Sequence, residues 1–176
     1  GRSSVVGGAG NEGGADRRET EGVVEVSDYL VGGVQHLHAA WGSKCQTVEP
    51  LNGPDGKWWT FGNSQEGCFV EPPHQNALIQ AVGGALAKTK SHTQVAASDV
   101  NSIDKAVPIF RAYDSDALKM LNRVNVHSYG GNARTQLSTL VESAGNEEWL
   151  SGYGADDASG RSRSRANVTD LRDSQS

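Results

Sequence analysis

Short strand-like segments alternate with helix-like segments along most of this chain, and this alternation is the feature that most limits its fold. Four segments have the character of buried strands, and they cover residues 46–50, 93–98, 123–127 and 147–152. Between them, apolar residues recur at helical spacing. Because strands that alternate with helices form parallel sheets with right-handed crossovers, the sequence predicts an α/β protein with about four parallel strands.

Residues typical of helix ends stand at the ends of the segments with helical spacing. Ser27 is placed to cap the first helix and Gly42 to end it, and Pro72 with Pro73 opens the second. The other helices are expected from Ser102 to about Tyr113, over residues 116–121, and along the face formed by Leu137, Leu140, Val141 and Ala144 before Gly145.

The length of the chain excludes a complete eightfold β/α barrel, which typically needs about 250 residues. The chain has 176 residues, of which 36% are hydrophobic and 22 are glycine, so we expect a thin stability margin. The predicted domain covers residues 25–160. A flexible glycine-rich arm over residues 1–24 and a loose polar tail over residues 161–176 are expected to flank it.

Charge and hydropathy argue against two classes of partner. The chain has 16 Lys+Arg and 21 Asp+Glu, a formal net charge of -5, which gives no electrostatic reason to bind nucleic acid. The serine/arginine run at 161–165 is interpreted as solvated surface. No apolar run reaches the length of about 18 residues that a membrane span requires.

Two weaker features bear on localisation. The spacing of Cys45 and Cys68 permits one disulfide bond without demonstrating it. Asn167-Val168-Thr169 is a formal glycosylation acceptor, and it favours a secreted protein, although residues 1–22 lack the apolar centre of a signal peptide.

Several separate motifs, in a fixed order, resemble one family of enzymes. They are Tyr29-Leu30-Val31 with Trp41, Glu49-Pro50-Leu51-Asn52 with Pro54, Trp58-Trp59-Thr60-Phe61, Gln65-Glu66-Gly67-Cys68, Ala97-Ser98-Asp99, Asn125-Val126-His127-Ser128-Tyr129, and Trp149-Leu150-Ser151 with Tyr153-Gly154. Residues 29–160 thereby resemble the middle and later part of the catalytic domain of glycoside hydrolase family 30, most closely the fungal endo-β-1,6-galactanases.

The resemblance implies a partial (β/α)8 barrel in which the four predicted strands correspond to strands four to seven. Strands one to three, most of the eighth unit and the β-sandwich of the family have no counterpart. The sheet then has two uncovered edges, which dimerisation into a homo-oligomer, local rearrangement or aggregation would have to manage. The implied substrate is the β-1,6-galactan side chains of arabinogalactan-type polysaccharides, with no cofactor or metal.

Both expected catalytic carboxylates are replaced by glycine. Asn52 and Pro54 match the family's Asn-Glu-Pro motif, where the glutamate is the acid/base, but Gly53 stands in its place. In the nucleophile motif Ser-Glu-Tyr-Gly, Gly152 likewise replaces glutamate. A retaining glycosidase needs both carboxyl groups, so we expect little or no hydrolysis. The replacements are consistent with deliberate inactivation, a decayed copy or an error in the sequence.

The resemblance also implies residues that line the sugar site. Asn52 matches the position that contacts a sugar 2-hydroxyl, and His127, Tyr129 and Trp149 match positions around the site. Trp58 and Trp59 are candidates to stack on galactose rings, or alternatively to pack their own loop. These residues support a second hypothesis, a noncatalytic galactan-binding or lectin-like protein. A third hypothesis is a soluble fragment without a function of its own.

Other titratable residues are weaker candidates. Glu49 and Glu148 each lie four positions before a glycine, about 13 Å along a strand, which is too far for them to replace the missing acids. Glu66 and Glu71 in the aromatic loop are alternative residual acids. His36 and His38 point away from each other on a helix, so they do not form a convincing metal pair.

Overall fold

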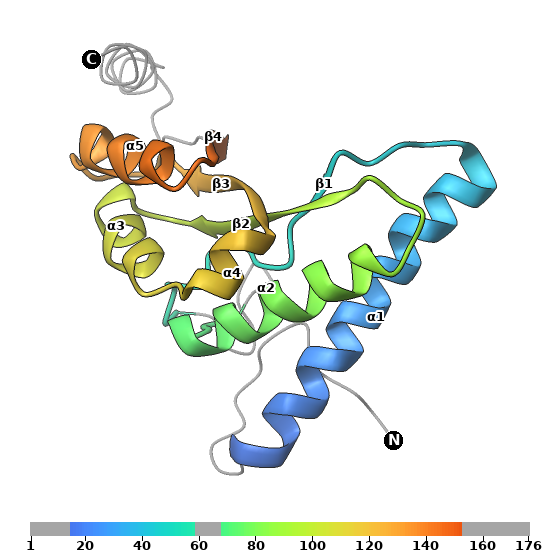
Figure 1. The fold of residues 1–176 in the computed structure, drawn as a ribbon. Helices are drawn as coiled ribbons and strands as arrows, with labels where there is room; N and C mark the ends of the chain where they lie inside the picture. Colours follow the sequence, from blue (N-terminus) through green and yellow to red (C-terminus); the bar gives the residue numbers. More distant parts are fainter. Residues whose placement is uncertain (1–14, 59–67, 153–176) are drawn as a thin grey trace, which may run out of the picture.

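The computed structural model describes residues 15–58 and 68–152, which form one parallel sheet with its helices (Figure 1). The elements are α1 (Ala15–Trp41), β1 (Thr47–Val48), α2 (Pro72–Ala87), β2 (Gln94–Val100), α3 (Ile103–Arg111), α4 (Ser115–Met120), β3 (Leu121–His127), α5 (Arg134–Ser143) and β4 (Glu147–Gly152). The glycosylation triplet, the serine/arginine run and most of the aromatic loop lie outside the described residues.

The four strands lie in the order β1-β2-β3-β4, and every neighbouring pair is parallel. Val48 lies beside Val95, Ala97 beside Val124, and Val126 beside Leu150. Each crossover contains helix: α2 joins β1 to β2, α3 and α4 join β2 to β3, and α5 joins β3 to β4. The predicted α/β class and the partial barrel-like topology are therefore confirmed.

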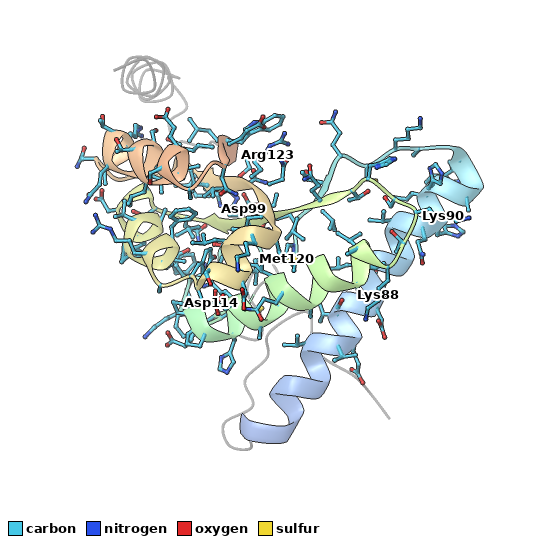
Figure 2. All side chains as sticks on the ribbon, viewed as in Figure 1. Lys88, Lys90, Asp99, Asp114, Met120 and Arg123 are labelled. Carbon is cyan, nitrogen blue, oxygen red and sulfur yellow. The ribbon has the colours of Figure 1, made fainter. Side chains whose placement is uncertain are left out.

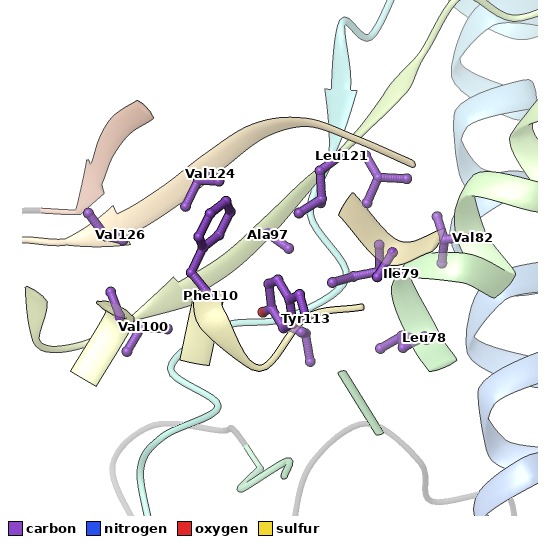
Figure 3. Packing of buried hydrophobic residues seen from close by; sticks show 14 of the residues in the cluster. Leu78, Ile79, Val82, Ala97, Val100, Phe110, Tyr113, Leu121, Val124 and Val126 are labelled. Atoms are coloured by element: carbon purple, nitrogen blue, oxygen red, sulfur yellow. The ribbon is translucent and has the colours of Figure 1, made fainter. Parts of the chain in front are cut away.

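The hydrophobic core lies between the sheet and its helices (Figure 3). Ile79 and Val82 of α2 are completely buried, and Phe110 packs against the strand residues Val124 and Val126 in the same cluster. Burial of each large apolar side chain contributes about 1.5–3 kcal/mol. α1 packs along α2, and so extends this core outward instead of covering the sheet itself (Figure 1).

The opposite face of the sheet is polar. Arg123, Asn125 and His127 alternate along β3 with Val124 and Val126, and only the two valines belong to the hydrophobic cluster. Because successive side chains of a strand point to opposite faces, β3 has one apolar and one polar face. In a closed barrel, this second face would line the interior.

The predicted start of the first helix at Ser27 was wrong. α1 begins at Ala15, so residues 15–24 of the expected flexible arm are helical. The physical reason is that the apolar stripe continues upstream: Val26 is buried and Val23 packs against the core. Ser27 itself lies inside the helix, with 3% of its surface exposed, and does not cap it.

The remaining boundaries differ by small amounts. β1 has two residues where five were predicted, α3 ends at Arg111, and β4 has the predicted bounds. α4 is capped by Asp114, whose carboxylate accepts hydrogen bonds from the N–H groups of Asp116 and Ala117. That carboxylate also accepts from Gln80 of α2, at 2.9 Å, and this contact holds α4 against α2.

Two further sequence features can be placed. Cys45 and Cys68 are both free thiols, and burial raises the pKa of Cys68. In the described part of the chain, we find no helix with the length and apolar character needed to cross a membrane.

The core predicts the effect of one deletion. Ile79→Ala removes a completely buried side chain from the contact between α2 and the sheet, and we expect it to lower the free energy of unfolding by about 2–5 kcal/mol. Val24→Ala, at an exposed position of α1, is the control and should change it by less than about 0.5 kcal/mol. Urea titrations of both variants measure the two changes in unfolding free energy. Equal changes would contradict the placement of Ile79 in the core.

Candidate functional site

The carboxyl ends of the four strands meet at one edge of the sheet. Gly53 follows β1, Asp99 lies near the end of β2, and His127 and Gly152 are the last residues of β3 and β4. In β/α barrels, the loops at this edge carry the active site. We refer to Gly53, Asp99, His127, Ser151 and Gly152 as the carboxyl-edge cluster.

Asp99 connects the members of this cluster. Its backbone carbonyl accepts a hydrogen bond from the Gly53 N–H at 2.9 Å. Its side-chain Oδ1 accepts one from the Ser151 hydroxyl and lies 3.7 Å from His127 Nε2. Asp99 has a positive φ of 52°, a conformation that aspartate adopts more readily than most residues. A single residue of β2 thus contacts segments that follow or end the other three strands.

Both glycines at the expected acid positions occupy environments that suit glycine. Gly53 is buried and has a φ of 57°, in the left-handed region that residues with a Cβ rarely adopt. At Gly152, an added Cβ would lie 2.5 Å from Cδ2 of His127, well inside van der Waals contact. The His127 ring therefore fills the space where a side chain at 152 would begin.

Glu49 lies under the cluster in an unusual electrostatic environment. Burial raises the pKa of its carboxyl well above the ordinary value, and the negative charge of Asp99 raises it further. A hydrogen bond from Asn125 Nδ2 to Oε2, at 2.7 Å, opposes the shift. The Oε1 atom is buried without a hydrogen-bond partner. Glu49 therefore has an enclosed carboxyl whose ionisation is disfavoured by its surroundings.

The structure brings several predicted sugar-contacting residues together. The rings of His127 and Tyr129 lie 4.8 Å apart, and 53% of Tyr129 is exposed. Trp149, in β4, is 50% exposed, and the Arg123 guanidinium lies 3.4 Å from its ring centroid. Asp99 belongs to β2 and Arg123 to β3, the two central strands of the sheet (Figure 2). Asn52 is exposed beside Gly53.

Trp58 belongs to a separate cluster. The Nζ atom of Lys105, in α3, lies 5.9 Å from the Trp58 ring centroid and 3.2 Å from Asp55 Oδ2. Asp55 Oδ1 accepts two hydrogen bonds from Asn101, and Asn101 Oδ1 lies 3.3 Å from His127 Nδ1. This polar chain links the Trp58 cluster to the carboxyl-edge cluster. The predicted partner Trp59 lies outside the described residues, as do Glu66 and Tyr153.

The other carboxylates differ in position. Glu148 accepts a hydrogen bond from Ser138 of α5 at 2.6 Å, so it points to the helical side of the sheet. Burial raises its pKa and the Ser138 bond opposes that rise. Glu71 is exposed at the start of α2. Within the described ranges, we find no group of three metal-ligating side chains. The carboxyl-edge cluster therefore offers hydrogen-bonding and aromatic groups, with Asp99 as its carboxylate.

The sequence reasoning missed Asp99, Asn101, Asp55 and Arg123. A usable signal existed for Asp99, because a carboxylate directly after a buried parallel strand lies at the edge where ligands bind. Asn101 follows the same strand by two residues. No local pattern marked Asp55 or Arg123, since their partners Lys105 and Trp149 are distant in sequence.

The environment of Glu49 predicts a pH-dependent stability. Because its pKa is raised in the folded state, stability falls as pH rises above the ordinary value of 4.5 toward the folded-state value. Glu49→Gln keeps an acceptor for Asn125 and cannot ionise. As the pH rises from about 4 to about 8, the unfolding free energy of Glu49→Gln should increase relative to that of the unmodified chain. Urea titrations across this range measure it, with exposed Asp28→Asn as the control; parallel pH curves for Glu49→Gln and the unmodified chain would contradict it.

The contact between Gly152 and His127 predicts a coupled pair of substitutions. Gly152→Ala should destabilise the protein by about 1–3 kcal/mol, because the new Cβ overlaps the imidazole. In a His127→Ala background, this cost should largely disappear. Gly84→Ala is the matched control: nothing lies within 4 Å of its added Cβ, and it should stabilise α2 by about 0.5–1 kcal/mol. A double-mutant cycle by chemical denaturation measures the coupling, and additive effects would refute the overlap.

Comparison with known proteins identifies a relative. No family model matches the chain. Over 136 residues, or 76% of this chain, the sequence is 35% identical to an endo-beta-1,6-galactanase from Hypocrea rufa. The match spans 28% of the length of that protein. The relationship to a galactanase that the motifs indicated is thus confirmed over most of the chain.

Proposed function

We propose that this chain is a glycoside-hydrolase-like protein, related to the retaining endo-β-1,6-galactanases of family 30, that has little or no hydrolase activity. The match spans 28% of the length of the relative. Activity, substrate and secretion are therefore proposed for this chain and are not transferred from the relative. The relevant substrate class is β-1,6-galactan, an extracellular polysaccharide.

The observation that carries this proposal is the environment of Gly152. Retaining hydrolysis uses a carboxylate nucleophile about 5–5.5 Å from the acid/base carboxyl. At Gly152 the His127 ring occupies the space that the side chain of such a nucleophile would need. The left-handed backbone at Gly53 disfavours a side chain at the other position. Both features support the loss of the chemical step.

Carboxylates nearby do not supply a replacement pair. Asp99 is held by Ser151 and lies beside His127, and Glu49 is buried with one oxygen bonded to Asn125. An acid and a nucleophile must both reach the same glycosidic bond from opposite sides. Buried Glu49 cannot do so without a rearrangement of β1.

A second candidate function is noncatalytic galactan binding. It is favoured by the half-exposed rings of Trp149 and Tyr129, which lie at the polar face and carboxyl edge of the sheet. Aromatic faces of this kind stack on the apolar faces of sugar rings. The two candidates share a site and differ only in whether binding persists without hydrolysis.

Hydrolysis and binding of β-1,6-galactan test both candidates. We expect no release of reducing ends above background, because neither acid position carries a carboxylate. Calorimetry with β-1,6-galactan oligomers should detect binding, and Trp149→Ala should weaken it by about 2- to 10-fold through loss of a stacking face. Trp41→Ala is the control, since Trp41 is also an exposed tryptophan, at 73%, but is the last residue of α1 and lies outside the sheet.

The possible results separate the hypotheses. Turnover that survives purification and is abolished by Asp99→Asn or Glu71→Gln would refute the loss of activity. Absence of any interaction with the oligomers would refute galactan binding and leave the fragment hypothesis. Equal affinities of the Trp149→Ala and Trp41→Ala variants would remove Trp149 from the site.

A further inference from the structure

A cavity of about 450 Å³ lies between the segment after β1 and helix α3, apart from the carboxyl-edge cluster. Its walls include the aromatic rings of Trp58 and Phe69. Lys57, Lys105, Asp55 and Glu71 supply its charged groups. We call it the Trp58 pocket. Its volume falls within the range of about 300–1,000 Å³ that is usual for small-molecule sites.

The aromatic walls of the Trp58 pocket are accessible. Trp58 is 49% exposed and Phe69 is 39% exposed. The Nζ atom of Lys57 lies 4.8 Å from the Phe69 ring centroid, and that of Lys105 lies 5.9 Å from the Trp58 ring. Each ring therefore has an ammonium group over one of its faces, so a hydrogen-bond donor lies next to each apolar ring.

Asp55 is a buried polar group in the wall of the pocket. Its side chain is 4% exposed, and Oδ1 is fully used by Asn101. Oδ2 is paired with the Lys105 ammonium at 3.2 Å but receives no hydrogen bond from the residues that the structure describes. A buried carboxylate oxygen with an empty acceptor position is costly unless a donor reaches it. A ligand hydroxyl in the pocket is a suitable donor.

The charges of the pocket indicate the class of ligand. Two lysines and two carboxylates balance, so the pocket has no net charge to attract an anion or a cation. The combination of aromatic faces, ammonium donors and carboxylate acceptors suits a neutral pyranose ring, whose C–H face is apolar and whose hydroxyls both donate and accept.

We propose that the Trp58 pocket is a second glycan-binding site, which takes neutral hexose units. This inference rests on the proposed galactan binding, because it assigns a further part of the same glycan to this pocket. Hydrogen bonds from Asn101 to Asp55 and between Asn101 and His127 connect the pocket to the carboxyl-edge cluster. A glycan chain long enough to reach both sites would then gain affinity over a short one.

Calorimetry with β-1,6-galactan oligomers of increasing length tests the proposal. Trp58→Ala and Phe69→Ala should each weaken binding of long oligomers by about 2- to 10-fold, as expected for loss of one stacking face. Neither should affect a disaccharide that binds at the carboxyl-edge cluster. Trp58→Phe keeps an aromatic face and should restore most of the affinity, while thermal unfolding of every variant checks that the fold is retained.

Each alternative result has a definite meaning. If long oligomers bind, Trp149→Ala weakens them, and both pocket variants bind as tightly as the unmodified chain, the pocket is not a glycan site although the proposed function stands. If no oligomer binds the unmodified chain, the proposed galactan binding itself fails, and the pocket assignment fails with it. Stronger binding of oligomers that carry a uronic acid than of neutral ones would overturn the neutral-ligand assignment.

Discussion

The hydrogen bonds of Asp99 and its contact with the His127 ring hold the carboxyl edge of this sheet together. An open sheet of four parallel strands has few contacts between its outer strands, and here β1 contributes only two paired residues. Asp99 compensates for this, because its backbone carbonyl binds the segment after β1 and its carboxylate binds Ser151 of β4. His127 is drawn toward the same carboxylate. These contacts fix Gly53, Ser151 and His127 relative to one another.

The same contacts determine the electrostatics of the interior. Burial and the charge of Asp99 act in the same direction on Glu49, so both raise the pKa of its carboxyl. The carboxyl is also bonded to Asn125, so it takes part in the packing of the polar face. A perturbed pKa therefore does not by itself identify a catalytic acid in this fold.

The sequence was most informative where local pattern and tertiary structure agree. The alternation of strands and helices predicted the parallel sheet, and the bounds of β4 and the proline start of α2 were correct. The pattern failed at Ser27, a typical capping residue that instead lies buried inside α1. It also gave no sign of the Asp55–Lys105 pair or of the Arg123 stack on Trp149. Such contacts join residues remote in sequence, and only the packed chain brings them together.

The environments of Gly53 and Gly152 bear on our proposal that this glycosidase-like scaffold persists without the reaction. When a side chain is deleted from a packed site, the neighbouring groups either leave a cavity or move into it. At Gly152 the imidazole of His127 fills the space, and it retains its contacts with Asn101 and Tyr129. The aromatic and polar groups that would contact a sugar are held by bonds independent of the missing carboxylates. Under the proposed noncatalytic binding, contact with a sugar would rest on the arrangement of the strand ends, whereas hydrolysis would need two carboxylates in addition.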